Sequence, residues 1–444
     1  MEAKLVVVAD VTNLIKDIKI IMKKISLTVI GLYLLLLSAH CQITNKDSVS
    51  VPVNTISTEY IDKPLRLEET NIVSSYYTQD GNHSAVTGGV GTEKVTDIST
   101  GIDLKFVGSD VKGHKYTLTT GLSVDHHTAA SSAYVNKSGA SKTGGTRVYP
   151  SINFSSENKM GSVVGIGIYY STEYNYKSFA LDASYSKKIG SGGELSTKIN
   201  GYFDQVKLIT PSELIPVTPA SPITTVTSAS GVTSSRGGGD NKSSIPSSPR
   251  YTYTGSVSYA QIINKKMQAS LIMDIVAQNG YLALPFHRVY FADGGVQVEN
   301  LPGNRLKLPF GLRVNYFLGD KVIVRSFYRY YTDDWGVVAH TASLELPIKM
   351  TPFFSVAPFY RYYTQTAAKY FAPYAVHKQS DNYYTSNYSY SAFNSSYYGV
   401  GIHIAPPAGL WKSAISAVDI RYGHYTQTTD LNSDVISFNF QLKR

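Results

Sequence analysis

Two-residue alternation of apolar and polar side chains is the feature that most constrains how this chain folds. From about Asn71 onward, segments of roughly ten residues alternate in this way and are separated by turn residues. In residues 161–170, for example, Val164, Ile166 and Ile168 share one face of the predicted strand. Amphipathic helix patterns are absent from this region. The sequence therefore predicts an all-β protein built from amphipathic strands.

Composition indicates which kind of β protein this is. Charged residues make up only 16% of the 444 residues, whereas soluble domains usually carry about 25%. Tyrosine is abundant, with 35 residues against 2 tryptophans. Beyond the N-terminal region there is no apolar run of the roughly 20 residues that a membrane helix needs. A chain poor in charge and rich in Tyr that lacks such helices is typical of a β-barrel in a membrane, whose apolar face meets lipid and whose polar face lines the lumen.

Short and long connections alternate along the chain. Tight turns are predicted at 190–193, 264–266 and 319–321. Long loops are predicted near 128–146, 209–249, 281–304 and 365–395. This pattern predicts a transmembrane antiparallel up-and-down barrel with short periplasmic turns and long extracellular loops. We expect about sixteen strands over residues 69–444, with fourteen or eighteen as the alternatives.

The N-terminal region predicts export to the cell envelope. From Met22 the chain has two lysines, an apolar run over 25–37 and small residues up to Cys41, which is the layout of a cleaved signal peptide. We expect cleavage after Cys41, and a lipoprotein lipidated at Cys41 is the alternative. Residues 1–41 are then a mis-assigned start followed by the signal, and residues 42–68 form a periplasmic tail. The expected location is the outer membrane of a Gram-negative envelope.

The mature chain gives little support for a nucleic-acid or thiol-based function. Without residues 1–41 it keeps 36 basic and 29 acidic residues and no cysteine. Disulfides and Cys-ligated metals are therefore excluded, and export argues against nucleic acid. We expect outer-membrane lipids and the outer-membrane assembly machinery as partners, and an envelope protein as a further candidate. The chain ends at Arg444, four residues past Phe440, whereas barrels commonly end on an aromatic residue.

A near-repeat contains the first candidate site residues. The sequence Phe-Tyr-Arg-Tyr-Tyr-Thr occurs at 327–332 and again at 359–364. Strand parity places one set of its tyrosines on the lipid side near the outer strand ends, where amphipathic rings form an aromatic girdle. The predicted girdle residues are Tyr328, Tyr330, Tyr360 and Tyr362.

The opposite parity predicts a row of charges in the lumen. Its predicted members are Arg313, Arg325, Arg329, Asp333, Arg361 and Arg421. Such a ladder could select anions, brace the wall through ion pairs or hold a folded-in loop. Asp333 and Asp334 do not suit a catalytic pair, because adjacent strand residues point to opposite faces.

A metal site has weaker support from the sequence. Asp125 and His127 could supply ligands together with His287, Asp80 or His83. No spacing of the HExxH type is present, and neighbouring histidines on a strand cannot both face the lumen. We therefore expect no metal, no other cofactor and no catalytic residues.

Several segments resemble a known family. They are YYTQDGNHSAVTGGVGTEKVTD (76–97), VDHHTAASSA (124–133), RVYPSINF (147–154), DQVKLI (204–209), GYLALPFHRVYF (280–291), ENLPGNR (299–305), FYRYYTDDWG (327–336) and FYRYYTQTAAKYFAP (359–373). The chain is similar to the bacterial outer-membrane barrels grouped as domain of unknown function 3570, in their Bacteroidetes-like form. The resemblance spans most of the mature chain. It implies a barrel in the outer membrane but no activity, because the family is uncharacterised.

Three functions are compatible with these features. The leading hypothesis is a pore for small solutes whose lumen arginines favour anions. The alternative is a closed barrel that acts as a scaffold or partner of envelope proteins, for which the resemblance suggests a redox or flavinylation link. The third is an enzyme sited at the extracellular rim, for which Asp125, His127, His287 and Asp333 are the candidates. We expect that the protein is not an enzyme.

Overall fold

The computed structural model describes residues 62–128, 144–173, 175–209, 214, 245–410 and 414–443. The predicted signal peptide and residues 42–61 of the predicted tail lie outside the described residues. Most of the predicted loops 128–146 and 209–249 also lie outside them. Among the described residues, no helix is long and apolar enough to span a membrane.

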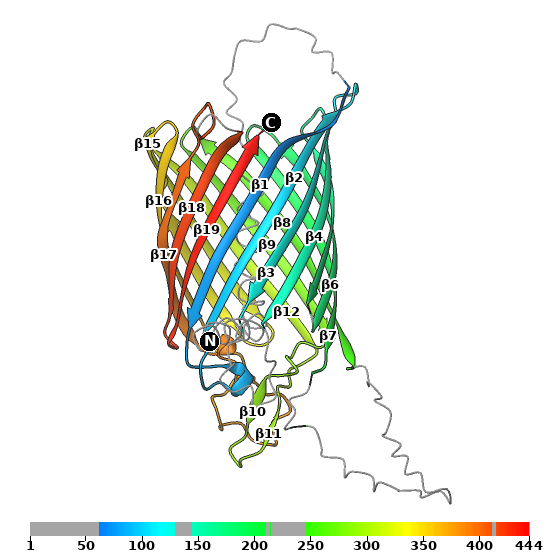
Figure 1. Cartoon of the computed structure of the whole chain (residues 1–444), viewed down its shortest axis with the longest axis vertical. Helices are drawn as coiled ribbons and strands as arrows, with labels where there is room; N and C mark the ends of the chain where they lie inside the picture. Colours follow the sequence, from blue (N-terminus) through cyan, green and yellow to red (C-terminus); the bar gives the residue numbers. More distant parts are fainter. Residues whose placement is uncertain are drawn as a thin grey trace, which may run out of the picture.

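All the described strands except β10 (Arg288–Tyr290) and β11 (Val296–Val298) form one antiparallel barrel (Figure 1). In wall order these strands are β1 (Lys63–Asp80), β2 (Val95–Ser109), β3 (Lys115–His127), β4 (Gly145–Glu157), β5 (Val163–Glu173), β6 (Tyr176–Ile189), β7 (Gly193–Lys207), β8 (Ser247–Asn264), β9 (Met267–Gly280), β12 (Asn304–Leu318), β13 (Val322–Asp333), β14 (Val338–Glu345), β15 (Ile348–Thr351), β16 (Phe354–Gln365), β17 (Phe393–Ile404), β18 (Ile415–Gln427) and β19 (Leu431–Lys443). Each strand pairs with the next in this order, except that β14 and β15 follow one another in the same position, and β1 also pairs with β19. The sheet therefore closes on itself.

Strands β14 and β15 are two halves of one wall strand. Both pair with β13 on one side and with β16 on the other. Leu346 and Pro347 separate them, and Pro347 has no N–H to contribute to a ladder. With β14 and β15 counted as one, the 17 strands of the sheet make a barrel of sixteen wall strands, which we call staves. This confirms the expected number.

The two faces of the wall have opposite character. On β5, Val164 and Ile166 are 56% and 57% exposed on the outer face. Gly165 and Gly167, which alternate with them along the strand, are buried on the inner face. The same alternation occurs on β9, where Leu271 is 62% exposed. An apolar outer belt around a closed barrel is the arrangement of a transmembrane β-barrel, which confirms the fold class predicted from the alternation.

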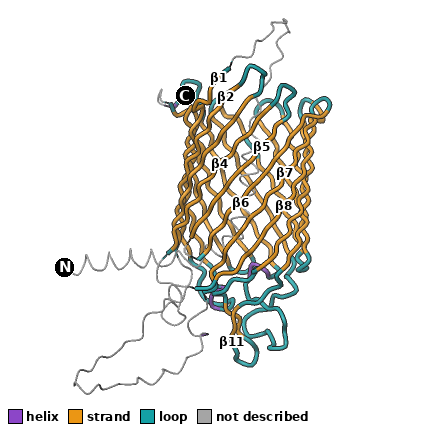
Figure 2. The backbone as a smooth tube through the Cα atoms, turned by 90° about the vertical axis from the view of Figure 1, so that its right-hand side faces the viewer, coloured by secondary structure: helices purple, strands orange, loops and turns teal. Residues whose placement is uncertain are grey.

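The two ends of the barrel differ in their connections (Figures 1 and 2). One end carries Lys63, Lys443 and short connections such as those between β8 and β9 and between β12 and β13. We call this the turn end. The opposite end carries the long connections after β1, β9 and β16, together with the hairpin of β10 (Arg288–Tyr290) and β11 (Val296–Val298). We call this the loop end.

The first strand begins earlier than the sequence pattern indicated. Residues 63–68 were expected in a tail, but they belong to β1 and pair with β2 as far as Ser109. This part of β1 lies beyond the pairing with β19, which stops at Glu69 opposite Lys443. The register between β1 and β2 also shifts between Lys63 and Arg66 and between Leu67 and Glu69. These irregularities interrupt the two-residue alternation that marks a strand in the sequence.

Candidate functional site

Three long loops meet at the loop end of the barrel. They are residues 81–94 with the short helix η1 (Ala85–Thr87), residues 281–303 with the β10–β11 hairpin, and residues 366–392 with the short helix η4 (Tyr388–Tyr390). We call the three together the cap. Figure 2 shows these loops gathered beyond the ends of the strands.

Contacts within the cap run between loops from opposite sides of the wall. The loop after β1 and the loop after β9 leave opposite sides of the sixteen-stave barrel. Nevertheless, Arg288 Nη1 donates a hydrogen bond to the carbonyl oxygen of Val86 at 2.7 Å. The His83 ring stacks on Tyr388 with centroids 3.7 Å apart, and Phe291 bridges to His377, so the third loop joins both others. The cap therefore crosses the mouth of the barrel.

The centre of the cap is packed like a protein interior. The Glu299 carboxylate accepts hydrogen bonds from the Leu284 N–H at 2.9 Å and from the Thr385 hydroxyl at 2.5 Å. His287 Nδ1 lies 3.6 Å from Glu299, and both side chains are almost completely buried. His377 Nε2 lies 3.0 Å from the carbonyl oxygen of Thr385. Buried and mutually bonded polar groups hold these loops in one arrangement.

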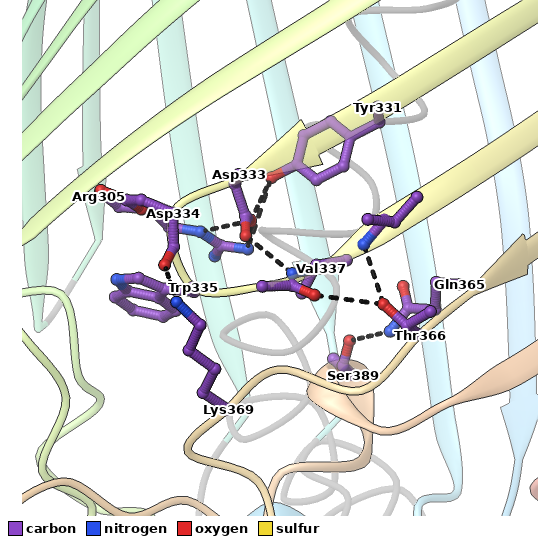
Figure 3. Close-up of polar contacts among 12 residues, drawn as sticks. Arg305, Tyr331, Asp333, Asp334, Trp335, Val337, Gln365, Thr366, Lys369 and Ser389 are labelled. Atoms are coloured by element: carbon purple, nitrogen blue, oxygen red, sulfur yellow. Dashed lines mark hydrogen bonds and ion pairs between the residues drawn. The ribbon is translucent and has the colours of Figure 1, made fainter.

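Asp333 fixes the turn between β13 and β14 to the barrel rim (Figure 3). Its Oδ2 accepts hydrogen bonds from Arg305 Nε at 2.9 Å and from the Tyr331 hydroxyl at 2.6 Å. Its Oδ1 accepts from the Val337 N–H at 3.0 Å. The Asp333 side chain is fully buried, and the Arg305 side chain is only 6% exposed. Protein donors therefore occupy both oxygens of the carboxylate and hold the turn against the rim.

Trp335 joins this turn to the cap. Its indole Nε1 donates to the carbonyl oxygen of Asn304 at 2.9 Å, and its ring is only 2% exposed. The Arg305 guanidinium lies 4.3 Å from the centre of the Trp335 ring, and the Tyr390 ring lies 5.7 Å from it. Burial raises the pKa of Tyr390 to about 12, although Arg305 acts against this shift. The Lys369 Nζ donates to the carbonyl oxygen of Asp334 at 3.0 Å (Figure 3), and the Lys369 N–H donates to that of Trp335, so the third cap loop is tied to the same turn.

The lumen carries an arginine patch on β13, β16 and β18. Arg325 Nη1 and Arg421 Nη2 lie 2.9 and 3.0 Å from the two oxygens of Glu345, so two guanidiniums share one carboxylate. Arg361 stacks over Tyr397 at 4.9 Å, and no described carboxylate lies within ion-pair distance of it. The side chains of Arg325 and Arg421 are 41% and 34% exposed, so solvent in the lumen reaches them. We call Arg325, Arg361, Arg421 and Glu345 the arginine patch.

The other residues of the predicted charge ladder are placed differently. Arg329 pairs with Asp274 at 3.4 Å, and Arg313 lies 5.6 Å above the Phe327 ring. Asp333 shares the inward parity of this row but belongs to the rim contact with Arg305. The ladder is therefore an excess of positive charge near Glu345, together with separate ion pairs closer to the loop end.

The four predicted girdle tyrosines stand on the outer face. Tyr328, Tyr360 and Tyr362 are 45%, 47% and 40% exposed, and Tyr330 is half-buried. The Tyr328 hydroxyl lies 2.7 Å from His340 Nδ1 on the same face. Their role at a membrane interface stays a prediction.

The three predicted metal candidates separate into two places. Asp125 and His127 lie together on the inner wall at the loop end, whereas His287 lies in the cap beside Glu299. His126 points away from this pair, and its Nδ1 lies 2.8 Å from the Thr146 hydroxyl. Sequence reasoning did not include Asp97, which lies on the neighbouring strand directly opposite His127. Register alone decides that pairing, so the sequence contained no signal for it.

Sequence reasoning also missed the residues that complete the cap. Arg305, Arg288 and Glu299 are deeply buried charges, but in the sequence they stand in predicted loops or at a strand end. The available signal was their place within the segments 280–291 and 299–305, which carry the family resemblance.

Comparison with known proteins places the chain as follows. The model of the family described as "Protein of unknown function (DUF3570)" matches residues 113–434. None of the curated proteins matches the chain. Among solved structures, OccD3 (OpdP) of Pseudomonas aeruginosa is similar with a TM-score of 0.42 and 8% identity, over 89% of this chain and 96% of that one. A BenF-like porin of Pseudomonas fluorescens Pf-5 is similar with a TM-score of 0.39 and 7% identity, over 85% of this chain and 98% of that one.

Proposed function

We propose that this chain, which belongs to the DUF3570 family of proteins of unknown function, forms an outer-membrane pore for small anionic solutes. One observation carries the proposal, namely that the solvated arginine patch sets three guanidiniums against the single carboxylate of Glu345. A lumen with excess positive charge attracts anions and repels cations.

The barrel geometry supports an outer-membrane location. An even number of staves returns both ends of the barrel chain to the turn end, as in bacterial outer-membrane barrels with short periplasmic turns. We infer that the turn end faces the periplasm and that the loop end, with its cap, faces the outside. The signal predicted from Met22 agrees with this orientation.

The cap limits what such a pore admits. The contact of Arg288 with Val86 joins opposite sides of the mouth, so the opening is divided among the gaps that the three loops leave. A passage of this kind suits small solutes and excludes polymers. The same contact favours a second candidate function, in which the cap closes the barrel and the protein serves as an outer-membrane scaffold or a partner of another envelope protein.

We infer that the protein is not an enzyme. Two of the rim residues considered for catalysis, Asp333 and His287, are engaged in the buried contacts with Arg305 and Glu299. Their bonding explains their burial without a reaction.

Ion conduction distinguishes the pore from the closed barrel. Purified protein reconstituted in planar bilayers with a potassium chloride gradient is compared with Trp335→Ala, which removes the anchor between the turn and the cap. We expect small steps with an anion-selective reversal potential for the wild type and larger steps for the variant. Steps in neither protein, with both shown to be folded by heat-modifiable mobility, would refute the pore and support the closed barrel.

A further inference from the structure

We propose that Asp97, Asp125 and His127 form a binding site for one divalent transition-metal ion on the inner wall at the loop end. Glu173 lies on the other side of the His127 ring, beside its Nε2, where it can hold the ring in place. The site is separate from the arginine patch and from the cap anchor at Asp333, and it does not depend on the proposed pore.

Strand register brings the three residues together. Asp97 of β2 lies directly opposite His127 of β3, and Asp125 precedes His127 by two residues on the same face. The chain neighbours of the two aspartates face outward, because Ile98 is 55% exposed and Val124 is 38% exposed on the lipid side. Because successive side chains of a strand point to opposite faces, all three side chains point into the lumen.

The donor atoms are close enough for one ion. One ligand atom from each of Asp97, Asp125 and His127 lies within 4.8 Å of the other two. Typical zinc–nitrogen and zinc–oxygen bonds are roughly 2.0–2.2 Å long, so small side-chain rotations bring the three donors onto a shared ion. His127 is fully buried and Asp125 is only 6% exposed, so the site is shielded from bulk solvent.

Asp125 is oriented so that one of its oxygens faces the site. Its Oδ2 accepts hydrogen bonds from Arg147 Nη2 at 2.9 Å and from the Tyr149 hydroxyl. Its Oδ1 has no hydrogen-bond partner among the described residues and lies 3.9 Å from His127 Nδ1. A buried carboxylate with one oxygen held by neighbours and the other directed at an imidazole is the arrangement that metal sites use to orient a ligand.

The opposite side of His127 is built to admit the ring closely. Gly145 of β4 pairs with His127, and a Cβ at position 145 would overlap the imidazole. Glu173 Oε1 lies 3.7 Å from His127 Nε2 on this side. A carboxylate at Nε2 orients the ring so that Nδ1 faces Asp125, and an ion shared with Asp97 would tie β2 to β3 at the mouth.

The donor set indicates the class of metal. One imidazole with two carboxylates suits Zn²⁺ or Mn²⁺, whereas Ca²⁺ and Mg²⁺ prefer sites made of oxygen alone. Asp97 and Asp125 also place two carboxylates beside the single guanidinium of Arg147, so a divalent cation lowers the repulsion between them.

Direct metal binding tests the proposal. Folded full-length protein without a histidine tag is stripped with a chelator and dialysed against Zn²⁺ or Mn²⁺ alone, and bound metal is measured by elemental analysis. We expect one ion per barrel and a rise in the temperature at which the folded band is lost on heating. His127→Ala and Asp97→Asn should weaken binding by roughly tenfold or more.

His126→Ala is the matched control, because His126 is the adjacent histidine on the outer face and should leave binding unchanged. Asp125→Asn keeps the size of the side chain and serves as a further variant should His127→Ala fail to fold. Stoichiometric binding that persists in both Asp97→Asn and Asp125→Asn would overturn the proposal. A wild-type protein that binds neither metal would overturn it as well, and so would equal losses in His126→Ala and His127→Ala.

Discussion

Reversing the charge of the inner wall should reverse the ion preference of the lumen. The variant Arg313→Glu with Arg361→Glu changes the wall by four unit charges. Both positions have inward parity, and Arg361 has no ion pair with a described carboxylate that the substitution would break. By contrast, Arg329 pairs with Asp274, so Arg329→Glu would place two carboxylates beside each other. Their repulsion could destabilise the barrel, and a change in ion selectivity could then not be separated from a change in folding.

The size of the effect follows from Coulomb's law. At about 10 Å in water, one unit charge changes the energy of a monovalent ion by about 0.4 kcal/mol, so four charges change it by about 1.7 kcal/mol. At an ionic strength of 0.1 M the Debye length is about 10 Å, which reduces the change to about 0.6 kcal/mol, or about threefold in local concentration. Because anions and cations respond in opposite directions, the ratio of their permeabilities should change about eightfold.

The assay is the reversal potential across a planar bilayer with a potassium chloride gradient, repeated at low and high salt. The matched control is Lys177→Glu with Lys187→Glu, which makes the same charge change on exposed residues of the outer face of β6. We expect the lumen variant to shift toward cation preference, more strongly at low salt, and the control to stay like the wild type. Unchanged selectivity in a conducting lumen variant would show that these arginines do not line the conducting path.

Two further predictions concern the rim and the lipid face. Asp333→Asn leaves Arg305 without its buried charged partner and should destabilise the turn by about 3–5 kcal/mol. We expect faster proteolysis within the cap of this variant. Asp334 is the exposed neighbour, so Asp334→Asn should be digested at the rate of the wild type. Equal digestion of both would contradict the anchor role of Asp333. Leu271→Arg places a charge in lipid at a cost of about 2–4 kcal/mol and should reduce the heat-modifiable folded band. Ile272 is the next residue and faces the lumen, so Ile272→Arg should still fold. Similar folded fractions for the two would refute the assigned faces of β9.

The barrel could be predicted from the sequence because its determinants are local. Lipid imposes an apolar side chain at every second position, and each strand shows this pattern without reference to its partners. Ile166 and Leu271 are therefore recognisable as outward residues in isolation. The exception at residues 63–68 also has a local cause, because register shifts at the start of β1 interrupt the alternation.

The cap could not be predicted because its determinants are distant in sequence. Arg288 meets Val86 across 202 positions, and the loops that carry them leave opposite sides of the wall. Neither loop shows a periodic pattern, since backbone hydrogen bonds and single buried side chains hold it in place. The resemblance at 280–291, 299–305 and 327–336 marked these segments as distinctive, but it did not reveal that they contact one another.

Register explains why the inner wall was predicted only in part. Parity predicts Arg325 and Arg361 on the lumen face without knowledge of their partners, because it depends only on the strand to which each belongs. Which groups face one another depends on the pairing register between the strands, and a shift of this register by one residue would separate Asp97 from His127. The ion pair of Arg421 with Glu345 also reaches between strands that are not adjacent, so even the correct register would not have revealed it. Which charged residues face inward can therefore be predicted from a barrel sequence. Which opposite charges pair with them can be read only from the structure of the closed barrel.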